Sequence, residues 1–343
     1  MRTALITTSI NVPTVLKLYR KLDPSVKFFV AADHKTPLEA YSFCADIPDC
    51  EIYSPERQKD LGYECSELLG WNTDSRRNIA LLKALKWGAE LIISIDDDMG
   101  MTPAPVVANY SENLFGFAHA FYDNFDGLQL GSPNQWFDAG LLTNPIAAQR
   151  GLPAGEGMIG GYSFVTDVKI GAAQGIILGV PDTGAITAIE RKPIVYGVTD
   201  VLRNGFVVHP QAYSVFNSQL TAFRRELAPA FAQFYNHQGR NTDIFASMLM
   251  RRVMAERNLY TYFGPPMGFH ARQPRPLFKD LKAEMFGLEH IDAFTKYVTE
   301  KELPGIGYTA INDCRFLMAN CPIFSDDFKE AAMAWYRDCE KVL

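Results

Sequence analysis

The sequence has 343 residues, and 48% of them are hydrophobic, which is enough for one large core or for a core with a helical appendage. A formal net charge of -6 argues against a protein that mainly binds the phosphate backbone of nucleic acid, because such proteins present a basic face. The six cysteines form no C-x-x-C pair, so the sequence favours free thiols over a zinc ribbon or a disulfide framework. The first residues do not resemble a signal peptide and no apolar run is long enough for a membrane span. We therefore expect a cytoplasmic protein without a membrane span.

The first hundred residues predict strands that alternate with helices. A strand at residues 3–8 is followed by a helix at residues 15–22 and by a strand at residues 27–33. Capping residues from Thr73 onward and a Gly88 stop delimit a further helix, and a strand at residues 90–95 leads directly into Asp96. This alternation predicts a parallel α/β sheet.

The rest of the chain divides into a loop-rich part and a helical part. Residues 116–199 are rich in Gly, Asn, Asp and Pro, and they predict loops with short strands at 127–132 and 192–197. Such loops often shape an acceptor pocket or a lid. Helical patterns are predicted at 220–227 and 242–258, a short strand at 260–264, and mostly amphipathic helix at 280–343.

Three consecutive carboxylates, Asp96, Asp97 and Asp98, follow the strand at residues 90–95. Open α/β sheets bind ligands outside the carboxyl ends of their strands, so these residues lie where a site is expected. In an extended segment Asp96 and Asp98 would project to one side and Asp97 to the other. Two carboxylates on one side can hold Mg²⁺ or Mn²⁺ and leave positions open for diphosphate oxygens. The alternative is an acidic turn that caps the next helix.

Basic residues occur in two segments that could bind a phosphate group. Arg76 and Arg77 open the helix before the acidic triplet, where guanidinium groups and helix amides can bind phosphate, or where they can form a solvated helix start. The segment after the strand at 260–264 carries His270, Arg272, Arg275 and Lys279. An imidazole can complete a carboxylate metal site and a nearby cation can bind the diphosphate, although a single His is often structural.

Several of these segments together resemble a known family. RRNIALLKALKWGAELIISIDDDM is similar to the helix, Gly-Ala, strand and DDD segment of the reversibly glycosylated polypeptides, also called UDP-arabinopyranose mutases, and of the STELLO-type glycosyltransferases. Upstream, DHKTP and ERQKDLGYECSELLGWNTDSRRN look like the STELLO-type sequence. Downstream, GGYSFVTDVKIGAAQGIILGVPDTGAIT, NSQLTAFRREL, GRNTDIFASM and GPPMGFHARQPRPLFKDLKAE follow in the mutase order. The resemblance covers most of the chain from Asp33 to about Gly287.

The resemblance implies a GT-A nucleotide-sugar fold, in which a Rossmann-like mixed sheet is flanked by helices. We expect this catalytic domain at residues 1–285, with a C-terminal helical extension at residues 286–343 packed on it. It also implies Mn²⁺ or Mg²⁺ as the cofactor, bound by Asp96 and Asp98 with His270 as a further ligand. The residues expected to bind the nucleotide sugar are Thr7, Asp33 near the base, Arg76, Arg77 and Arg272 facing the diphosphate, Asp96 and Lys279.

Catalytic roles are assigned to Asp97 and Asp243. Asp243 falls on an acidic position of the family, where it could contact the sugar or the acceptor or act as a base. Capping of the helix that follows is the other interpretation of Asp243.

One departure from the family concerns the arginine that becomes glycosylated in the mutases, because the corresponding residue here is Gly160. We therefore expect a glycosyltransferase that moves a sugar from a UDP- or GDP-sugar to an unknown acceptor, either a small molecule or a glycan. The alternatives are a mutase or self-glycosylating protein, and a catalytically silent scaffold of a glycosyltransferase complex. No nucleic-acid partner is expected, and a homo-oligomer stays open.

Overall fold

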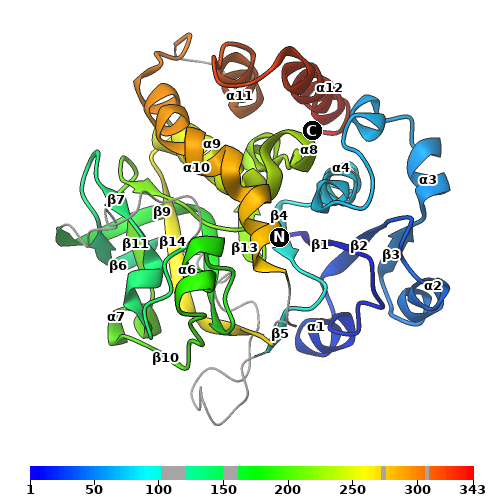
Figure 1. Cartoon of the computed structure of the whole chain (residues 1–343), viewed down its shortest axis with the longest axis horizontal. Helices are drawn as coiled ribbons and strands as arrows, with labels where there is room; N and C mark the ends of the chain where they lie inside the picture. Colours follow the sequence, from blue (N-terminus) through cyan, green and yellow to red (C-terminus); the bar gives the residue numbers. More distant parts are fainter. Residues whose placement is uncertain (102–120, 122, 150–160, 272–275, 306–308) are drawn as a thin grey trace.

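The computed structural model describes residues 1–101, 121, 123–149, 161–271, 276–305 and 309–343. These residues form a mixed α/β fold in which a large central sheet is flanked by helices, consistent with a Rossmann-like architecture (Figure 1). Strands β1–β3 and helices α1–α4 occupy the right-hand side of Figure 1, and β6, β9, β11 and β14 the left-hand side. Helices α10, α11 and α12 lie toward the top.

Ten of the described strands form the central sheet, in the order β3-β2-β1-β4-β13-β9-β6-β11-β14-β5. Their bounds are β1 (Thr3–Ser9), β2 (Lys27–Ala32), β3 (Cys50–Tyr53), β4 (Leu91–Ile95), β5 (Gly100–Met101), β6 (Phe125–Leu130), β9 (Tyr162–Gly179), β11 (Phe206–Val208), β13 (Leu220–Arg224) and β14 (Leu259–His270). Two short pairs lie outside it, β7 (Trp136–Phe137) with β12 (Tyr213–Ser214), and β8 (Thr143–Asn144) with β10 (Gly197–Val198).

The first part of the sheet confirms the predicted alternation. β3, β2, β1 and β4 are parallel neighbours, in the strand order of a doubly wound nucleotide-binding half. The helices between them are α1 (Leu16–Leu22), α2 (Leu38–Ala45), α3 (Pro55–Asp60) and α4 (Arg77–Trp87). α4 ends as predicted at Gly88, whose φ of 90° is left-handed and therefore suits glycine.

The second part of the sheet is mixed, and two sequence predictions fail there. Residues 220–224 form β13, which runs antiparallel between β4 and β9, instead of a helix. A short apolar run fits a buried strand as well as a helix, and pairing on both sides decides for the strand.

The 18-residue strand β9 occupies a segment that was predicted as loop. Its glycines suggested turns, but Gly171 lies where a Cβ would stand 2.9 Å from the Leu259 side chain, so glycine lets β14 approach closely. The predicted strand at 192–197 is also wrong, because only an isolated bridge at Val195 and the start of β10 are paired.

Two apolar cores cover the two faces of the sheet, as expected from strand alternation. Leu5 packs on one face with Leu16 and Tyr19 of α1, whereas Ile6 faces the other side with Ile79 of α4. The described residues carry six free cysteines. Within these same ranges, no helix combines the length and the apolar character needed to cross a bilayer.

The C-terminal helices share the larger core. The remaining helices are α6 (Ala185–Glu190), α7 (Asp200–Asn204), α8 (Tyr235–Gln238), α9 (Thr242–Ala255), α10 (Leu277–Glu300), α11 (Ala310–Ala319) and α12 (Asp326–Val342). Phe294 of α10 and Trp335 of α12 belong to the core that contains Ile79, and Trp335 Nε1 donates to Pro229 O at 2.9 Å. The predicted boundary between residues 285 and 286 falls inside α10.

Candidate functional site

Several strand ends meet at one edge of the central sheet. β1, β2 and β4 are parallel, β13 is antiparallel to both β4 and β9, and β14 is parallel to β9. The carboxyl ends of β1, β2, β4, β9 and β14 therefore lie on the same edge as the amino end of β13. This is the edge at which open α/β sheets bind ligands.

The acidic triplet forms a turn at this edge, because β4 ends at Ile95 and Met99 N donates to Asp96 O at 3.1 Å. The side-chain alternation expected for an extended segment therefore does not apply to the triplet. The three carboxylates have different partners, which lie on β1, α4, β14 and the segment before β13.

Asp98 contacts His270, the last residue of β14. Asp98 Oδ2 lies 2.9 Å from His270 Nε2, although the residues are 172 positions apart. The Asp98 side chain is 59% exposed and that of His270 is 3% exposed. His270 Nδ1 is buried without a hydrogen-bond partner. A buried imidazole thus supports an accessible carboxylate.

Asp96 is held by two other residues. Its Oδ1 accepts from Arg77 at 2.6 Å and its Oδ2 accepts from Gln219 Nε2 at 2.9 Å. The Arg77 side chain is 4% exposed, so this ion pair lies at the inner wall of the site. Arg77, which was expected to face the diphosphate, contacts Asp96, whereas His270 contacts Asp98.

Asp97 accepts a hydrogen bond from the Ser9 hydroxyl at the end of β1. Burial raises the pKa of Asp97 to about 6; the Ser9 bond opposes the rise, and the Asp98 and Asp96 carboxylates add to it. Ser9 was not predicted, although its place at the carboxyl end of a strand could have indicated it. The triplet therefore concentrates negative charge at the sheet edge.

The donor set partly fits the expected divalent cation. Among the described residues, no group of three or more His, Cys, Asp or Glu side chains is arranged to hold a metal ion. Asp98 and His270 offer two neighbouring ligands beside a concentrated negative charge. Mg²⁺ often binds through one or two carboxylates and takes substrate phosphates and water for its other positions, so the edge fits a cation held mainly by a bound diphosphate.

Asp243 lies at the start of α9 and is 4% exposed. Its Oδ2 accepts from Ser218 N at 3.3 Å and its Oδ1 from Ile244 N at 3.0 Å. Ser218 O in turn accepts from Arg77 at 3.3 Å. Asp243 therefore belongs to the network that positions Arg77, and its contacts combine helix capping with a place beside the site.

Two predicted nucleotide-binding residues, Asp33 and Thr7, are buried. Asp33 accepts backbone hydrogen bonds from His34 N at 2.7 Å and from Asn72 N at 2.6 Å, so both of its oxygens have partners. It nevertheless lines an open hollow of about 370 Å³ with Tyr41 at the end of β2. Thr7 is 0% exposed and its hydroxyl donates to the backbone oxygen of Thr8. The prediction that Thr7 contacts a ligand is therefore wrong for this conformation.

Arg76 is enclosed by other protein groups and does not take the predicted place facing the diphosphate. It is 0% exposed, and it donates to Gln58 Oε1 and to Ser66 O at 2.6–2.9 Å. Its Cζ lies 3.7 Å from the centre of the Trp71 ring, on which the guanidinium stacks. Burial lowers the pKa of Arg76 to about 10. A guanidinium with these partners has no face left for a phosphate.

Of the other two predicted cations, Lys279 and Arg272, the structure describes only Lys279. Lys279 is exposed in the first turn of α10, and no described contact joins it to Asp98 or His270. Arg272 lies outside the described residues, as do Arg275, Gly160 and residues 116–120, 122 and 150–159 of the predicted loop-rich part.

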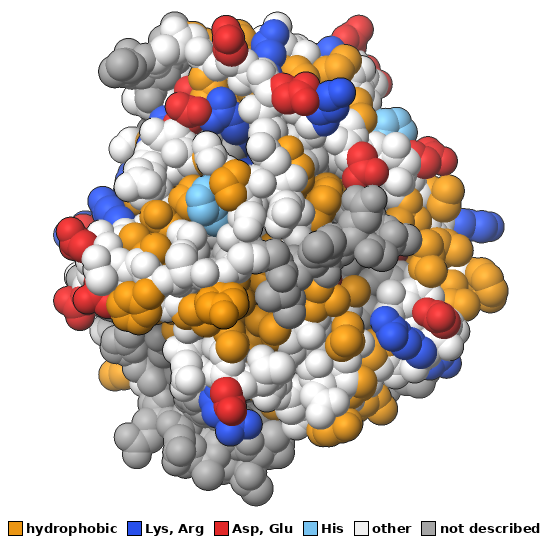
Figure 2. Space-filling model, turned by 90° about the vertical axis from the view of Figure 1, so that its left-hand side faces the viewer, with side chains coloured by type: hydrophobic (Ala, Val, Ile, Leu, Met, Phe, Trp, Pro, Cys, Tyr) orange, Lys and Arg blue, Asp and Glu red, His pale blue; other side chains and the backbone are white. Residues whose placement is uncertain are grey.

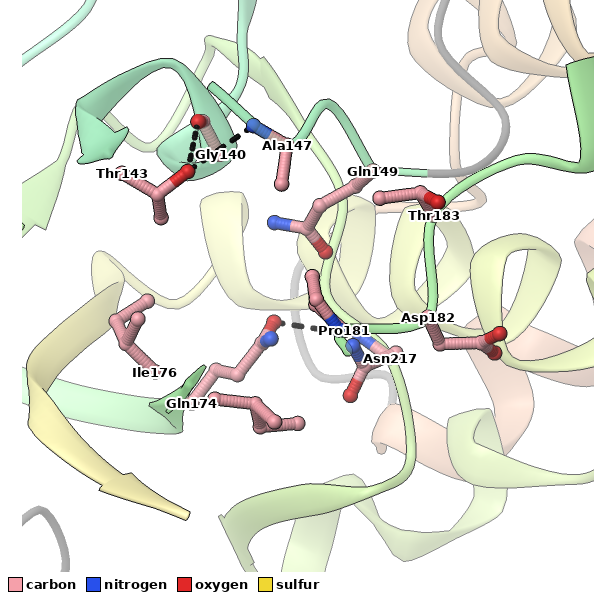
Figure 3. Close-up of a pocket in the computed structure, with 11 residues that line it drawn as sticks. Gly140, Thr143, Ala147, Gln149, Gln174, Ile176, Pro181, Asp182, Thr183 and Asn217 are labelled. Atoms are coloured by element: carbon pink, nitrogen blue, oxygen red, sulfur yellow. Dashed lines mark hydrogen bonds between the residues drawn. The ribbon is translucent and has the colours of Figure 1, made fainter. Parts of the chain in front are cut away.

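A small pocket is lined by residues of β9 and of the segments around residues 140–149, 181–183 and 217 (Figure 3). Its side chains include Gln149, Gln174, Asn217 and Asp182, none of which was predicted. Neutral amides have no distinctive sequence pattern, so they could be found only from the structure. Asn217 and Gln219 belong to the same short segment, which places the pocket next to Asp96.

Asp138 supports one wall of this pocket. Its raised pKa predicts that the stability of the fold depends on pH. Its oxygens accept from Gly140 N at 2.8 Å and from Gln149 N at 2.9 Å, yet burial raises its pKa to about 6. The folded protein therefore holds this proton at pH values at which the unfolded chain has released it. The stability that this retained proton adds is at its maximum below the ordinary pKa of Asp, and it is lost as the pH rises through about 6.

Asp138→Asn removes this titration. We expect the unfolding free energy of the wild type to fall by about 1 kcal/mol relative to the variant between pH 5 and pH 7. Urea denaturation of both proteins at the two pH values measures this difference. A difference that stays constant, or that rises between pH 5 and pH 7, would contradict the raised pKa.

The chain matches no known family model and no curated protein sequence.

On the face in Figure 2, Lys and Arg side chains lie mostly beside Asp and Glu among scattered hydrophobic side chains. That face therefore carries mixed charge, in agreement with the net charge of -6.

Proposed function

We propose that the chain is a metal-dependent GT-A glycosyltransferase that moves a sugar from a UDP- or GDP-sugar to a separate acceptor, and that it is related to the mutase and STELLO-type proteins. The contact between Asp98 and His270, at 2.9 Å, carries the proposal. The resemblance to the mutase and STELLO-type proteins had implied both residues as ligands of one cation. Their meeting at the ligand-binding edge of a Rossmann-like sheet supports that function.

In the proposed site, Asp98 and His270 would hold Mn²⁺ or Mg²⁺. When bound, the cation offsets negative charge on the departing nucleoside diphosphate. Asp98 is exposed enough to meet a ligand, while the buried His270 orients it. Arg77 and Gln219 keep the Asp96 carboxylate at the inner wall, close to the same charge.

The nucleoside would lie toward the hollow at the end of β2. Asp33 shapes this hollow through its backbone hydrogen bonds, and Tyr41 offers an aromatic ring at its wall. We propose a positioning role for Asp243, because its bond to Ser218 N supports the segment that holds Arg77 and Asp96. Its low exposure argues against a role as the general base.

Isothermal titration of the purified protein with UDP, GDP, CDP and dTDP, each with Mn²⁺ and then with EDTA, tests the proposal. Binding of one nucleotide that is lost with EDTA would support a metal-bridged donor site. Absence of binding by all four would favour the silent scaffold. Mass spectrometry after incubation with nucleotide sugars separates the remaining alternative, because a covalent hexose or pentose adduct would indicate a self-glycosylating protein.

A further inference from the structure

The small pocket beside the acidic triplet has a volume of about 40 Å³, roughly the room of three water molecules. It is joined to the triplet by hydrogen bonds through one segment. Gln219 N donates to Asn217 Oδ1 at 3.0 Å, and Gln219 Nε2 donates to Asp96 Oδ2 at 2.9 Å. A group bound in the pocket would therefore be adjacent to the proposed donor site.

Gln149 presents a hydrogen-bond acceptor to this pocket. The Gln149 side-chain amide also bonds to Asp138 and favours its ionised form, which can only accept, so the amino group faces Asp138. The opposite atom, Gln149 Oε1, is buried and has no hydrogen-bond partner. In Figure 3 the Gln149 amide projects toward Gln174 and Asn217. A buried carbonyl oxygen without a partner is costly, and a ligand that donates a hydrogen bond would remove that cost.

Gln174 and Asn217 present donors on the other side. Gln174 Oε1 accepts from Asn217 N at 3.3 Å, which leaves the Gln174 amino group as its donor. Asn217 Oδ1 accepts from Gln219 N, so the Asn217 amino group is likewise a donor. The pocket thus combines one acceptor with two donors, and a hydroxyl group both donates and accepts.

The charge of the pocket favours a neutral ligand. Asp182, the charged residue of its lining, pairs with Arg240 at 2.8 Å. Ile176 and Ile177 supply apolar contacts. No cationic side chain lines it among the described residues, so it lacks what a phosphate or carboxylate needs.

We infer that this pocket binds a hydroxyl-bearing edge of a neutral sugar, with Gln149 accepting from the hydroxyl group and Gln174 and Asn217 donating to it. Its volume of about 40 Å³ admits a hydroxyl or hydroxymethyl group. The sugar is either that of the donor or that of the acceptor. The choice of a sugar as ligand rests on the proposed glycosyltransferase function.

The test uses Gln149→Met and Gln174→Met, which keep side-chain length but remove the hydrogen-bonding groups. Gln129→Met is the control, because Gln129 is a buried glutamine of β6 outside the pocket, bonded to Ser163 Oγ. Titration calorimetry with Mn²⁺ gives the affinities for UDP and UDP-glucose, and for GDP and GDP-mannose. Saturation-transfer NMR gives the binding of free glucose, galactose and arabinose.

For a donor-sugar pocket, both variants should lose roughly tenfold in affinity for the nucleotide sugar while binding of the free nucleotide stays unchanged. For an acceptor pocket, both should lose the NMR signal of a free sugar instead. Gln129→Met should behave as the wild type in both measurements. Unchanged binding in both measurements would overturn the inference.

If the protein binds no nucleotide, the proposed function is refuted. The free-sugar measurement then tests separately whether the pocket binds a sugar. A sugar signal that is lost in both pocket variants would uphold the pocket, and the absence of any such signal in the wild type would overturn it.

Discussion

Asp98→Asn is expected to weaken Mn²⁺-dependent nucleotide binding by at least about 100-fold and to abolish sugar transfer. The substitution removes the negative charge of the exposed ligand and leaves a weaker amide oxygen beside His270. Because the side chain is 59% exposed, the unfolding free energy should change by at most about 1 kcal/mol. Calorimetric titration and urea denaturation of the same preparation measure the two effects.

The matched control is Asp200→Asn, because Asp200 is an exposed carboxylate whose described ion pair is with Arg203 at 3.7 Å. It should bind nucleotide and metal as the wild type does. If Asp98→Asn also kept wild-type metal dependence, the assignment of Asp98 as a ligand would be wrong.

Arg76→Met is expected to destabilise the fold by about 3–5 kcal/mol. The change leaves Gln58 Oε1 and Ser66 O buried without their donor, and it removes the stacking on Trp71. Methionine fills most of the space, so lost hydrogen bonds rather than a cavity dominate the effect. Urea denaturation measures the loss of stability.

Nucleotide binding by the folded fraction of Arg76→Met should equal that of the wild type, since Arg76 is 0% exposed. Arg203→Met serves as the control for loss of an exposed arginine, whose side chain is 54% exposed, and should change stability by less than about 1 kcal/mol. Normal stability combined with weak nucleotide binding in Arg76→Met would restore the original prediction that this residue faces the diphosphate.

The sequence was sufficient where apolar periodicity and strand-end rules determine structure. Ile79, Leu82 and Leu85 have helical spacing and are all buried in α4, and Gly88 ends that helix. The strand that follows leads into Asp96, so the edge of the sheet that carries the triplet could be predicted.

The side-chain arrangement within that edge depended on contacts between distant segments. The triplet forms a turn in which Asp97 binds Ser9 and Asp98 contacts His270, and the strand alternation that we expected for it does not apply. Arg76 and Arg77 are adjacent in the sequence, but one is enclosed by Gln58 and the other reaches Asp96. A local pattern cannot distinguish these environments.

Two strands of the second half, β9 and β13, were missed for a different reason. β9 combines apolar residues with glycines that permit close approach to β14, so its composition resembles that of loops. β13 is short, and only its two antiparallel neighbours separate it from a helical turn. Pairing partners far along the chain determined both elements.

The position of α10 bears on how this protein can be shortened for biochemical work. A chain ending at residue 285 would cut α10 and remove Phe294 and Trp335 from the core they share with Ile79. The exposed apolar surface on α4 and on the segment around Pro229 would then favour aggregation. The residues of the proposed donor site precede that cut, yet they rest on a core that α10 and α12 complete, so a shortened chain should include α12.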